Sequence, residues 1–184
     1  MTTPQMIRTA LTDLTGVAHP VVQTGMGWVA GAKLVSATAN AGALGILASA
    51  TMTYDELEKA IIETKKPFGV NLRADAGDAV ERSELLIKHG VKVASFALAP
   101  KEALIKRLKD AGVVVIPSIG AVKHAEKVAS WGADAVMIQG GEGGGHTGAV
   151  PTSILLPSVV SSVDIPVIAA GGFSGGRGLA AALA

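Results

Sequence analysis

The chain has 184 residues, of which 49% are hydrophobic and 17% charged, enough for a single domain over residues 1–184 with a sizeable core. A net charge of +1 and an aromatic content of 3% argue against a surface for nucleic acid or an anionic membrane. The absence of cysteine excludes disulfides, thiolate metal ligands and cysteine nucleophiles. The same absence fits a reducing, cytoplasmic setting. Because no apolar stretch approaches the roughly 18 residues of a membrane span and residues 1–15 lack a signal-type apolar run, we expect a soluble protein.

Short apolar runs alternate with segments of helical spacing along the chain. Strands are expected at 19–24, 42–47, 67–72, 91–97, 112–118, 135–139 and 165–170. Helices are expected over 30–41, 53–62, 78–88, 101–110 and 122–129, and from about Arg177 onward. Thr53, with Glu56 three residues later, has the pattern of a capping box. A longer step follows the sixth strand, and no helix is assigned to it.

The spacing of the strands predicts the fold class. Strand starts recur about every 22 to 24 residues, the period of one strand, one helix and two loops. Short, fully apolar strands indicate parallel pairing with both faces buried. Glycines or polar residues follow many of the strands, as expected at the mouth of a (β/α)8 barrel, whereas an open sheet would collect them at one switch point. We therefore predict an α/β protein of the TIM-barrel type, truncated after strand seven, either a shortened chain or a fragment of a longer protein.

The sixth strand runs directly into a loop with six glycines around His146. Glycine lets the main chain lie against a flat or anionic ligand, since no side chain holds it away. His146 is the one group of this loop that titrates near neutrality, which makes it the candidate for proton chemistry. Glu142 either orients His146, contacts substrate or is a solvent-exposed charge. No metal site is expected, because no second histidine or carboxylate cluster lies at ligand spacing.

Two further glycine turns follow apolar strands. Gly171 and Gly172 precede a helix, so their N–H groups and the helix dipole suit a phosphate; a tight strand-to-helix turn is the alternative. The turn formed by Gly25, Met26 and Gly27 is consistent with either a ligand contact or simple turn geometry.

Polar side chains also stand at strand ends. The amides of Asn71 and Gln139 can hydrogen-bond the edge of a heteroaromatic ring or cap nearby loop backbone, and Ser118 offers a smaller hydroxyl. Walker, dinucleotide-binding and Gly-x-Ser-x-Gly patterns are absent from the sequence, which lowers support for nicotinamide-fold and serine-hydrolase functions.

Four segments together resemble the nitronate monooxygenase family, formerly 2-nitropropane dioxygenases. They are Gln23-Thr24-Gly25-Met26-Gly27, Pro67-Phe68-Gly69-Val70-Asn71, Gln139-Gly140-Gly141-Glu142-Gly143-Gly144-Gly145-His146 and Ala169-Ala170-Gly171-Gly172. Members are FMN-dependent (β/α)8 barrels and include flavin-dependent enoyl-acyl-carrier-protein reductases. Residues 21–50 and 140–148 are most similar to an actinobacterial branch linked to steroid-ring catabolism on CoA thioesters.

The resemblance implies an enzyme with FMN as cofactor and His146 as the base that takes an α-proton from the substrate. It also implies that Gly25, Met26, Asn71 and Gln139 line the isoalloxazine. The predicted cofactor-binding set is Gly25, Met26, Gly27, Asn71, Ser118, Gln139, Gly144, Gly145, Gly171 and Gly172, with the last two on the FMN phosphate.

The predicted function is that of an FMN-dependent oxidoreductase of nitronate monooxygenase type. It would oxidise an acidic carbon next to a nitro or thioester group, so its partner is a small-molecule nitronate or CoA thioester, with no nucleic acid and no membrane. The sequence also allows a homo-oligomer. Three alternatives stay open: a flavin-dependent oxidoreductase of enoyl or steroid-derived CoA thioesters, a non-flavin lyase or isomerase that keeps the phosphate site, and an inactive fragment.

Overall fold

A computed structural model describes residues 6–145 and 148–184. The chain divides into two compact units, Met1–Val115 and Ile116–Ala184. The strands follow one another in sequence order from β1 to β7. This order of strands, with helices between them, is that of a TIM-barrel type α/β fold, so the predicted fold class is confirmed. Whether residues 1–184 behave as a single domain stays a prediction.

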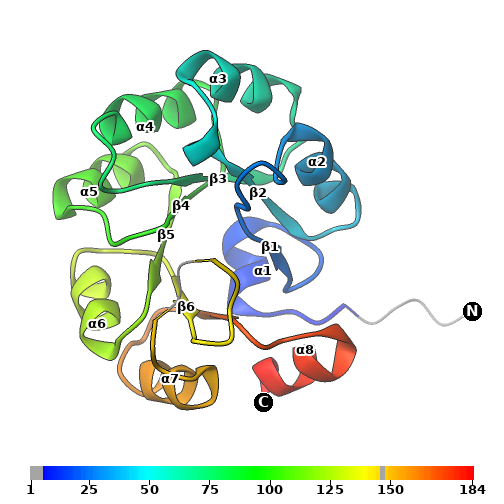
Figure 1. The fold of residues 1–184 in the computed structure, drawn as a ribbon, viewed down its shortest axis with the longest axis vertical. Helices are drawn as coiled ribbons and strands as arrows, with labels where there is room; N and C mark the ends of the chain where they lie inside the picture. Colours follow the sequence, from blue (N-terminus) through cyan, green and yellow to red (C-terminus); the bar gives the residue numbers. More distant parts are fainter. Residues whose placement is uncertain (1–5, 146–147) are drawn as a thin grey trace, which may run out of the picture. The chain divides into compact units, whose positions relative to one another are not determined.

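The first unit is built on parallel strands that pair in sequence order (Figure 1). They are β1 (Val22–Gln23), β2 (Leu44–Ala48), β3 (Phe68–Leu72) and β4 (Val93–Phe96). The start of β5 (Val114–Ile119) joins them, since the Val114 N–H donates to the Lys92 carbonyl over 3.0 Å. All side chains of β2 and β4 are buried, which agrees with apolar strands covered on both faces.

Helices cover the outer side of these strands (Figure 1). They are α2 (Ala32–Asn40), α3 (Tyr54–Glu63), α4 (Ala79–Lys88) and α5 (Glu102–Asp110), with α1 (Ala10–Thr15) before β1 and the 3-10 turn η1 (Ser49–Thr51) after β2. The capping box is confirmed: the Thr53 N–H donates to Glu56 Oε2 over 2.8 Å, and the Glu56 N–H donates to Thr53 Oγ1 over 3.3 Å. The apolar stripes of α3 to α5 bury leucines and isoleucines against the sheet.

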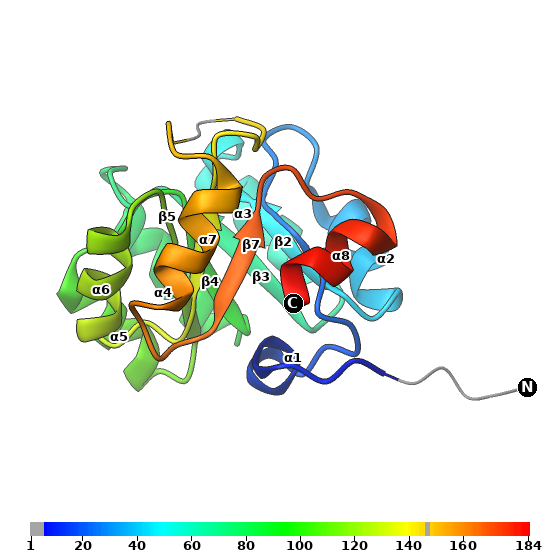
Figure 2. The same cartoon turned by 90° about the horizontal axis from the view of Figure 1, so that it is seen from below.

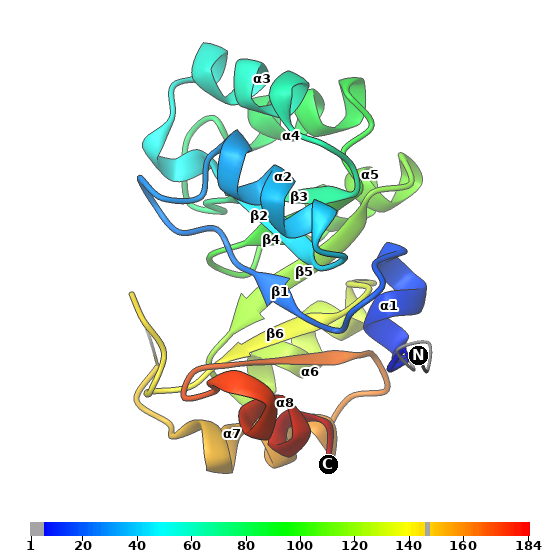
Figure 3. The ribbon, with the colours of Figure 1, turned by 90° about the vertical axis from the view of Figure 1, so that its right-hand side faces the viewer.

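The second unit continues the pattern with α6 (Val122–Ser130), β6 (Val136–Gln139), α7 (Thr152–Val160), β7 (Val167–Ala170) and α8 (Gly175–Leu183). Strand β6 pairs in parallel with β5 on one side and β7 on the other, and Figure 3 shows β6 and β7 running side by side. Helix α7 packs against both β6 and β7, as Figure 2 shows for β7. This packing brings the loop after β6 next to the loop after β7.

Two helices, α1 and α7, are not predicted by the sequence patterns. Helix α1 is short and lies in a polar segment, where Thr9 and Thr12 cap it reciprocally. Helix α7 carries Pro157 inside it and is apolar on nearly every side, with Ile154 and Val160 exposed while Leu155 and Val159 are buried. An apolar stretch without a polar face has no helical period to detect, and proline argues against a helix. The longer step between strands six and seven, to which no element was assigned, therefore contains a helix.

Candidate functional site

In the first unit the end of β3 packs directly against the turn that follows β1. A β-carbon on Gly25 would lie 2.6 Å from Asn71 Cβ and 3.3 Å from the Leu47 carbonyl oxygen. Real side chains do not tolerate the shorter distance. Gly25 is therefore required by close packing, and the predicted pair of Gly25 and Asn71 is in contact.

Two buried serines hold Asn71 in place. The Asn71 Nδ2 donates to Ser95 Oγ over 3.2 Å, and the Ser49 hydroxyl donates to the Asn71 carbonyl over 2.6 Å. Ser95 is completely buried and Ser49 is 1% exposed. Both serines were missed from the sequence, because a small hydroxyl in a strand or turn carries no local signal of function. These bonds fix both the backbone and the side-chain amide nitrogen of Asn71.

Gln23, the last residue of β1, carries an unsatisfied acceptor. Its Nε2 donates to the Thr24 carbonyl and, over 3.2 Å, to the Ile46 carbonyl. Among the described residues its Oε1 is buried without a hydrogen-bond partner. A buried unpaired acceptor is costly, and an N–H group at the edge of a bound heterocycle would satisfy it. This orphaned oxygen fits a flavin, whose ring edge carries such a donor.

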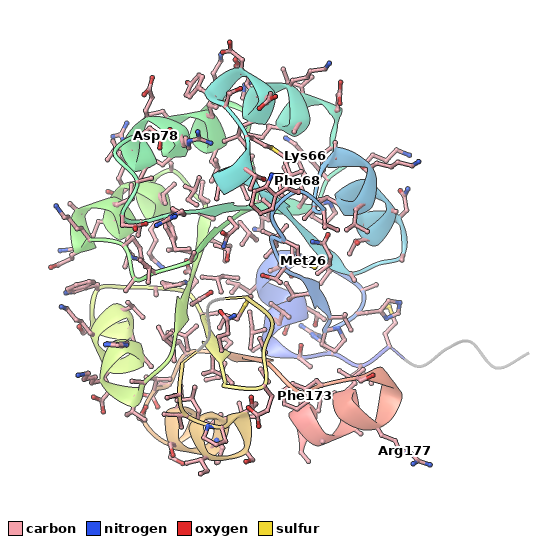
Figure 4. All side chains as sticks on the ribbon, in the orientation of Figure 1. Met26, Lys66, Phe68, Asp78, Phe173 and Arg177 are labelled. Carbon is pink, nitrogen blue, oxygen red and sulfur yellow. The ribbon has the colours of Figure 1, made fainter. Side chains whose placement is uncertain are left out.

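The turn after β1 presents Met26 and Gly27 beside these groups. Met26 is 39% exposed, and its side chain is labelled in Figure 4. Its carbonyl accepts hydrogen bonds from the N–H groups of Val29 and Ala30 over 3.1 and 2.8 Å. A β-carbon on Gly27 would lie 3.1 Å from Thr51 Cγ2. The turn is thus fixed by its own backbone and by the segment after β2.

In the second unit Gln139 ends β6 and holds the glycine loop. Its Nε2 donates to the Gly144 carbonyl over 3.0 Å, so the loop-capping alternative describes its amide group. Among the described residues, which do not include 146–147, no atom beyond the chain neighbours lies within 4 Å of a β-carbon built on Gly144 or Gly145, and Gly145 has a φ of 78°. No other described side chain or backbone covers the main chain at these two glycines, so a flat ligand could lie against it.

Glu142 and Gly171 connect this loop to β7 and α7. Glu142 Oε2 accepts hydrogen bonds from the Thr152 N–H over 2.8 Å and from Thr152 Oγ1 over 2.9 Å. These bonds, chiefly the one from the backbone, lower the pKa of Glu142. A β-carbon on Gly171 would lie 2.9 Å from both Gly143 N and Thr152 Oγ1. The role of Thr152 was missed, and the interpretations of Glu142 did not include this contact.

The remaining predicted residues have simpler surroundings. Gly171 and Gly172 both have positive φ, 106° and 80°, and Gly172 is exposed with Glu142 beside it. Ser118 lies half-buried in β5, paired with Met137. His146 lies outside the described residues. In the part of the chain that the structure describes, no three acidic or histidine side chains gather to hold a metal ion, and no helix is long and apolar enough to cross a membrane.

Comparisons with known proteins identify relatives of this chain. The protein of Rhodococcus jostii (strain RHA1) named (3aS,4S,5R,7aS)-5-hydroxy-7a-methyl-1-oxo-octahydro-1H-indene-4-carboxyl-CoA dehydrogenase is 75% identical over 182 residues, 97% of this chain and 52% of that protein. Its namesake in Mycobacterium tuberculosis (strain ATCC 25618 / H37Rv) is 72% identical over 184 residues, 96% of this chain and 52% of that protein. This chain thus spans about half the length of these curated relatives.

Solved structures agree with the sequence relatives. FabK from Thermotoga maritima superimposes with a TM-score of 0.92 at 42% identity, over 96% of this chain and 58% of that chain. The family model of nitronate monooxygenase matches residues 8–184, which is nearly the whole chain. The chain therefore belongs to the nitronate monooxygenase family.

Proposed function

We propose that this protein is an FMN-dependent oxidoreductase that oxidises a carbon activated by a neighbouring CoA thioester. The observation that carries the proposal is the identity of 75% and 72% to two proteins named as dehydrogenases of an indene-carboxyl-CoA. Membership of the nitronate monooxygenase family supports the reaction type, in which a proton and two electrons leave an acidic carbon. The sequence resemblance to the steroid-linked branch points to the same substrate class.

The cofactor assignment rests on features of each unit, taken separately, that suit a flat, phosphorylated ligand. In the first unit Gln23 Oε1 is an unpaired buried acceptor, and Gly25 and Asn71 form a close-packed wall. In the second unit the bare backbone of Gly144 and Gly145 suits the face of a ring, and Gly171 with Gly172 suits the phosphate. FMN, when bound, supplies an acceptor for two electrons.

His146 is proposed as the base. The pKa of an unperturbed imidazole is already near neutrality. A histidine can therefore act as a general base at neutral pH without its surroundings having to shift that pKa far. The carbon next to a thioester carbonyl is acidic, so a positioned imidazole would take its proton. A double bond would then form to the adjacent carbon as that carbon loses a hydride, and bound FMN would supply the acceptor for the hydride. Gln139, through its bond to the Gly144 carbonyl, fixes the loop segment that leads to His146.

A nitronate is the second candidate substrate. The name of the family supports it, and a nitro group activates its neighbouring carbon as a thioester does. The two candidates share the cofactor and the base, and they differ in the group that must be accommodated beyond the acidic carbon.

Anaerobic reduction of protein-bound FMN separates these possibilities. The purified protein should bind FMN, and a bicyclic carboxyl-CoA thioester should bleach the flavin absorbance faster than a nitronate does. His146→Ala should keep FMN but lose most of the reduction rate, whereas His124→Ala, at an exposed position on α6, should leave both unchanged. Protein that cannot be loaded with FMN would refute the proposal in favour of a non-flavin barrel or an inactive chain. An unchanged rate of flavin reduction in His146→Ala would refute the assignment of His146 as the base.

A further inference from the structure

A cavity of about 280 Å³ opens in the first unit, between the loop after β1 and the η1–α3 segment. Trp28, Val29, Ala48 and Met52 give it apolar walls, and Thr51 and Glu56 are its polar members. Both segments follow the carboxyl ends of their strands, the end at which barrel enzymes bind their substrates. None of its walls belongs to the predicted cofactor-binding set.

The wall formed by Trp28 is held in an unfavourable conformation. Trp28 has a φ of 59°, the left-handed region that bulky residues avoid, and its side chain is 91% exposed. The Trp28 N–H donates to Thr51 Oγ1 over 3.2 Å, which fixes the backbone next to the cavity. Backbone strain of this kind is concentrated at ligand sites, and an exposed indole gains free energy when an apolar group covers it.

The charge of the cavity selects against phosphate-bearing ligands. No lysine or arginine lines it, and Glu56 does. The Thr53 backbone N–H bonds to the Glu56 carboxylate and lowers its pKa, so that the group stays ionised at neutral pH. An anionic nucleotide placed there would meet the like charge of Glu56 and no lining cation, since Arg82, which bonds the Met52 carbonyl, is paired with Asp78. The cavity therefore suits a neutral, apolar group.

The size and position of the cavity indicate a part of a larger substrate. Pockets that enclose a whole drug-sized ligand measure roughly 300–1,000 Å³, so 280 Å³ takes a small ring system and not a complete CoA thioester. Trp28 follows Met26 by two residues, a separation of at most about 7 Å along the chain. Because Met26 belongs to the predicted cofactor-binding set, a ring system bound against Trp28 would lie next to the predicted flavin site.

We propose that this cavity binds the neutral, saturated fused-ring part of a CoA-thioester substrate, with Trp28 as the covering wall. The inference rests on the proposed function for its substrate class and goes beyond it in assigning the residues that select the acyl group. Trp28, Val29 and Met52 are then specificity-determining residues.

Tryptophan fluorescence tests the proposal without turnover. The chain has two tryptophans, so Trp131→Phe leaves Trp28 as the sole emitter. In this variant 1-decalone, a neutral saturated bicyclic ketone, should shift the emission to shorter wavelength and protect it from acrylamide. Val29→Asp should weaken 1-decalone binding at least tenfold. Val80→Asp is the matched control, because Val29 and Val80 are 60% and 59% exposed and Val80 lies on α4, outside the cavity; it should bind 1-decalone unchanged.

Several results would overturn the assignment. They are an emission that 1-decalone leaves unchanged, an equal shift with free CoA, and equal weakening by both aspartate variants. A blue shift that appears on raising the protein concentration alone would assign the surface to a second copy of the chain instead. FMN binding, followed separately by the quenching of free FMN fluorescence, tests the proposed function. Protein that binds 1-decalone but not FMN would contradict the proposed function alone. Protein that binds FMN but not 1-decalone would contradict the cavity assignment alone.

Discussion

Glu142 Oε2 accepts two hydrogen bonds from Thr152, one from its backbone N–H over 2.8 Å and one from its hydroxyl over 2.9 Å. The pair joins the glycine loop after β6 to the first residue of α7. A carboxylate at the N-terminus of a helix is favoured by the unpaired N–H groups and by the helix dipole. The glycine loop is thereby tied to a helix that packs on β6 and β7.

Replacement of Glu142 should loosen the loop without unfolding the protein. Glu142→Ala removes both bonds to Thr152, so we expect FMN binding to weaken severalfold in a fluorescence titration, with little change in the far-ultraviolet circular dichroism. Glu126→Ala, at an exposed position on α6, should bind FMN as the unmodified chain does. Equal FMN affinity in all three proteins would show that the contact does not organise the loop.

The same contact predicts a pH dependence with a defined sign. The pKa of Glu142 is lowered in the folded protein, mainly by the Thr152 N–H. Its stabilisation is therefore complete above the unfolded-state pKa of about 4.3 and is lost as the pH falls through the lower folded-state value. The difference in urea midpoint between the unmodified chain and Glu142→Gln should be constant from pH 6 to 8 and should shrink progressively as the pH falls below about 4.3. A difference that grows in acid would contradict the assignment.

Gly25→Ala tests the packing of the predicted flavin wall. The added β-carbon would lie 2.6 Å from Asn71 Cβ, so that either the turn or β3 must move. Overpacking of this kind costs about 1–3 kcal/mol, measurable by urea denaturation, and we expect FMN binding to be lost as well. Gly31→Ala is the control in the same loop, because no atom of the described residues beyond its chain neighbours lies within 4 Å of its β-carbon, and it should bind FMN normally.

Gly171→Ala and Gly176→Ala should have opposite effects on the free energy of unfolding. Gly171 has a φ of 106° and no room for a β-carbon beside Gly143 N and Thr152 Oγ1, so we expect a loss of about 3 kcal/mol. Gly176 lies in the first turn of α8, with no atom of the other described residues within 4 Å of its β-carbon, and alanine there should gain up to about 0.5 kcal/mol. Chemical denaturation of the two variants measures both values. A stabilising Gly171→Ala would show that the left-handed backbone is not required.

Arg82 should contribute more than the other arginine pairs of the first unit. Its side chain is 14% exposed and donates to Asp78 Oδ2 over 2.6 Å and to the Ser49 and Met52 carbonyls over 2.9 and 3.0 Å. Arg82→Ala leaves two carbonyls of the segment after β2 without this donor, so unfolding should require about 2–3 kcal/mol less. Arg107→Ala removes an exposed pair with Glu84, at 55% and 41% exposure, and should cost under about 1 kcal/mol. Equal losses in urea denaturation would contradict this ranking.

The order of strands and helices could be predicted because its signals are local. The Thr53–Glu56 capping box and the apolar run at 67–72 each involve only residues that are close together in the sequence. The structure contains both, as the start of α3 and as strand β3. Helix α8 begins at Gly175, two residues before the predicted start near Arg177, and Figure 4 shows Arg177 projecting outward from it. Helix α7 was not predicted, because its own sequence shows no helical period. Its stability comes from packing against β6 and β7.

The candidate site, too, could be predicted from the sequence only in part. The sequence by itself determined where glycines and amides stand at the ends of strands, since these residue types are recognisable one at a time. Only the tertiary structure decided that Gly25 is required by Asn71, that Ser49 and Ser95 hold that asparagine, and that Glu142 bonds to Thr152. Each of these contacts joins residues 10 to 46 positions apart. Side chains that far apart in sequence meet only when the strands and helices between them have packed, so a linear pattern does not encode their distance.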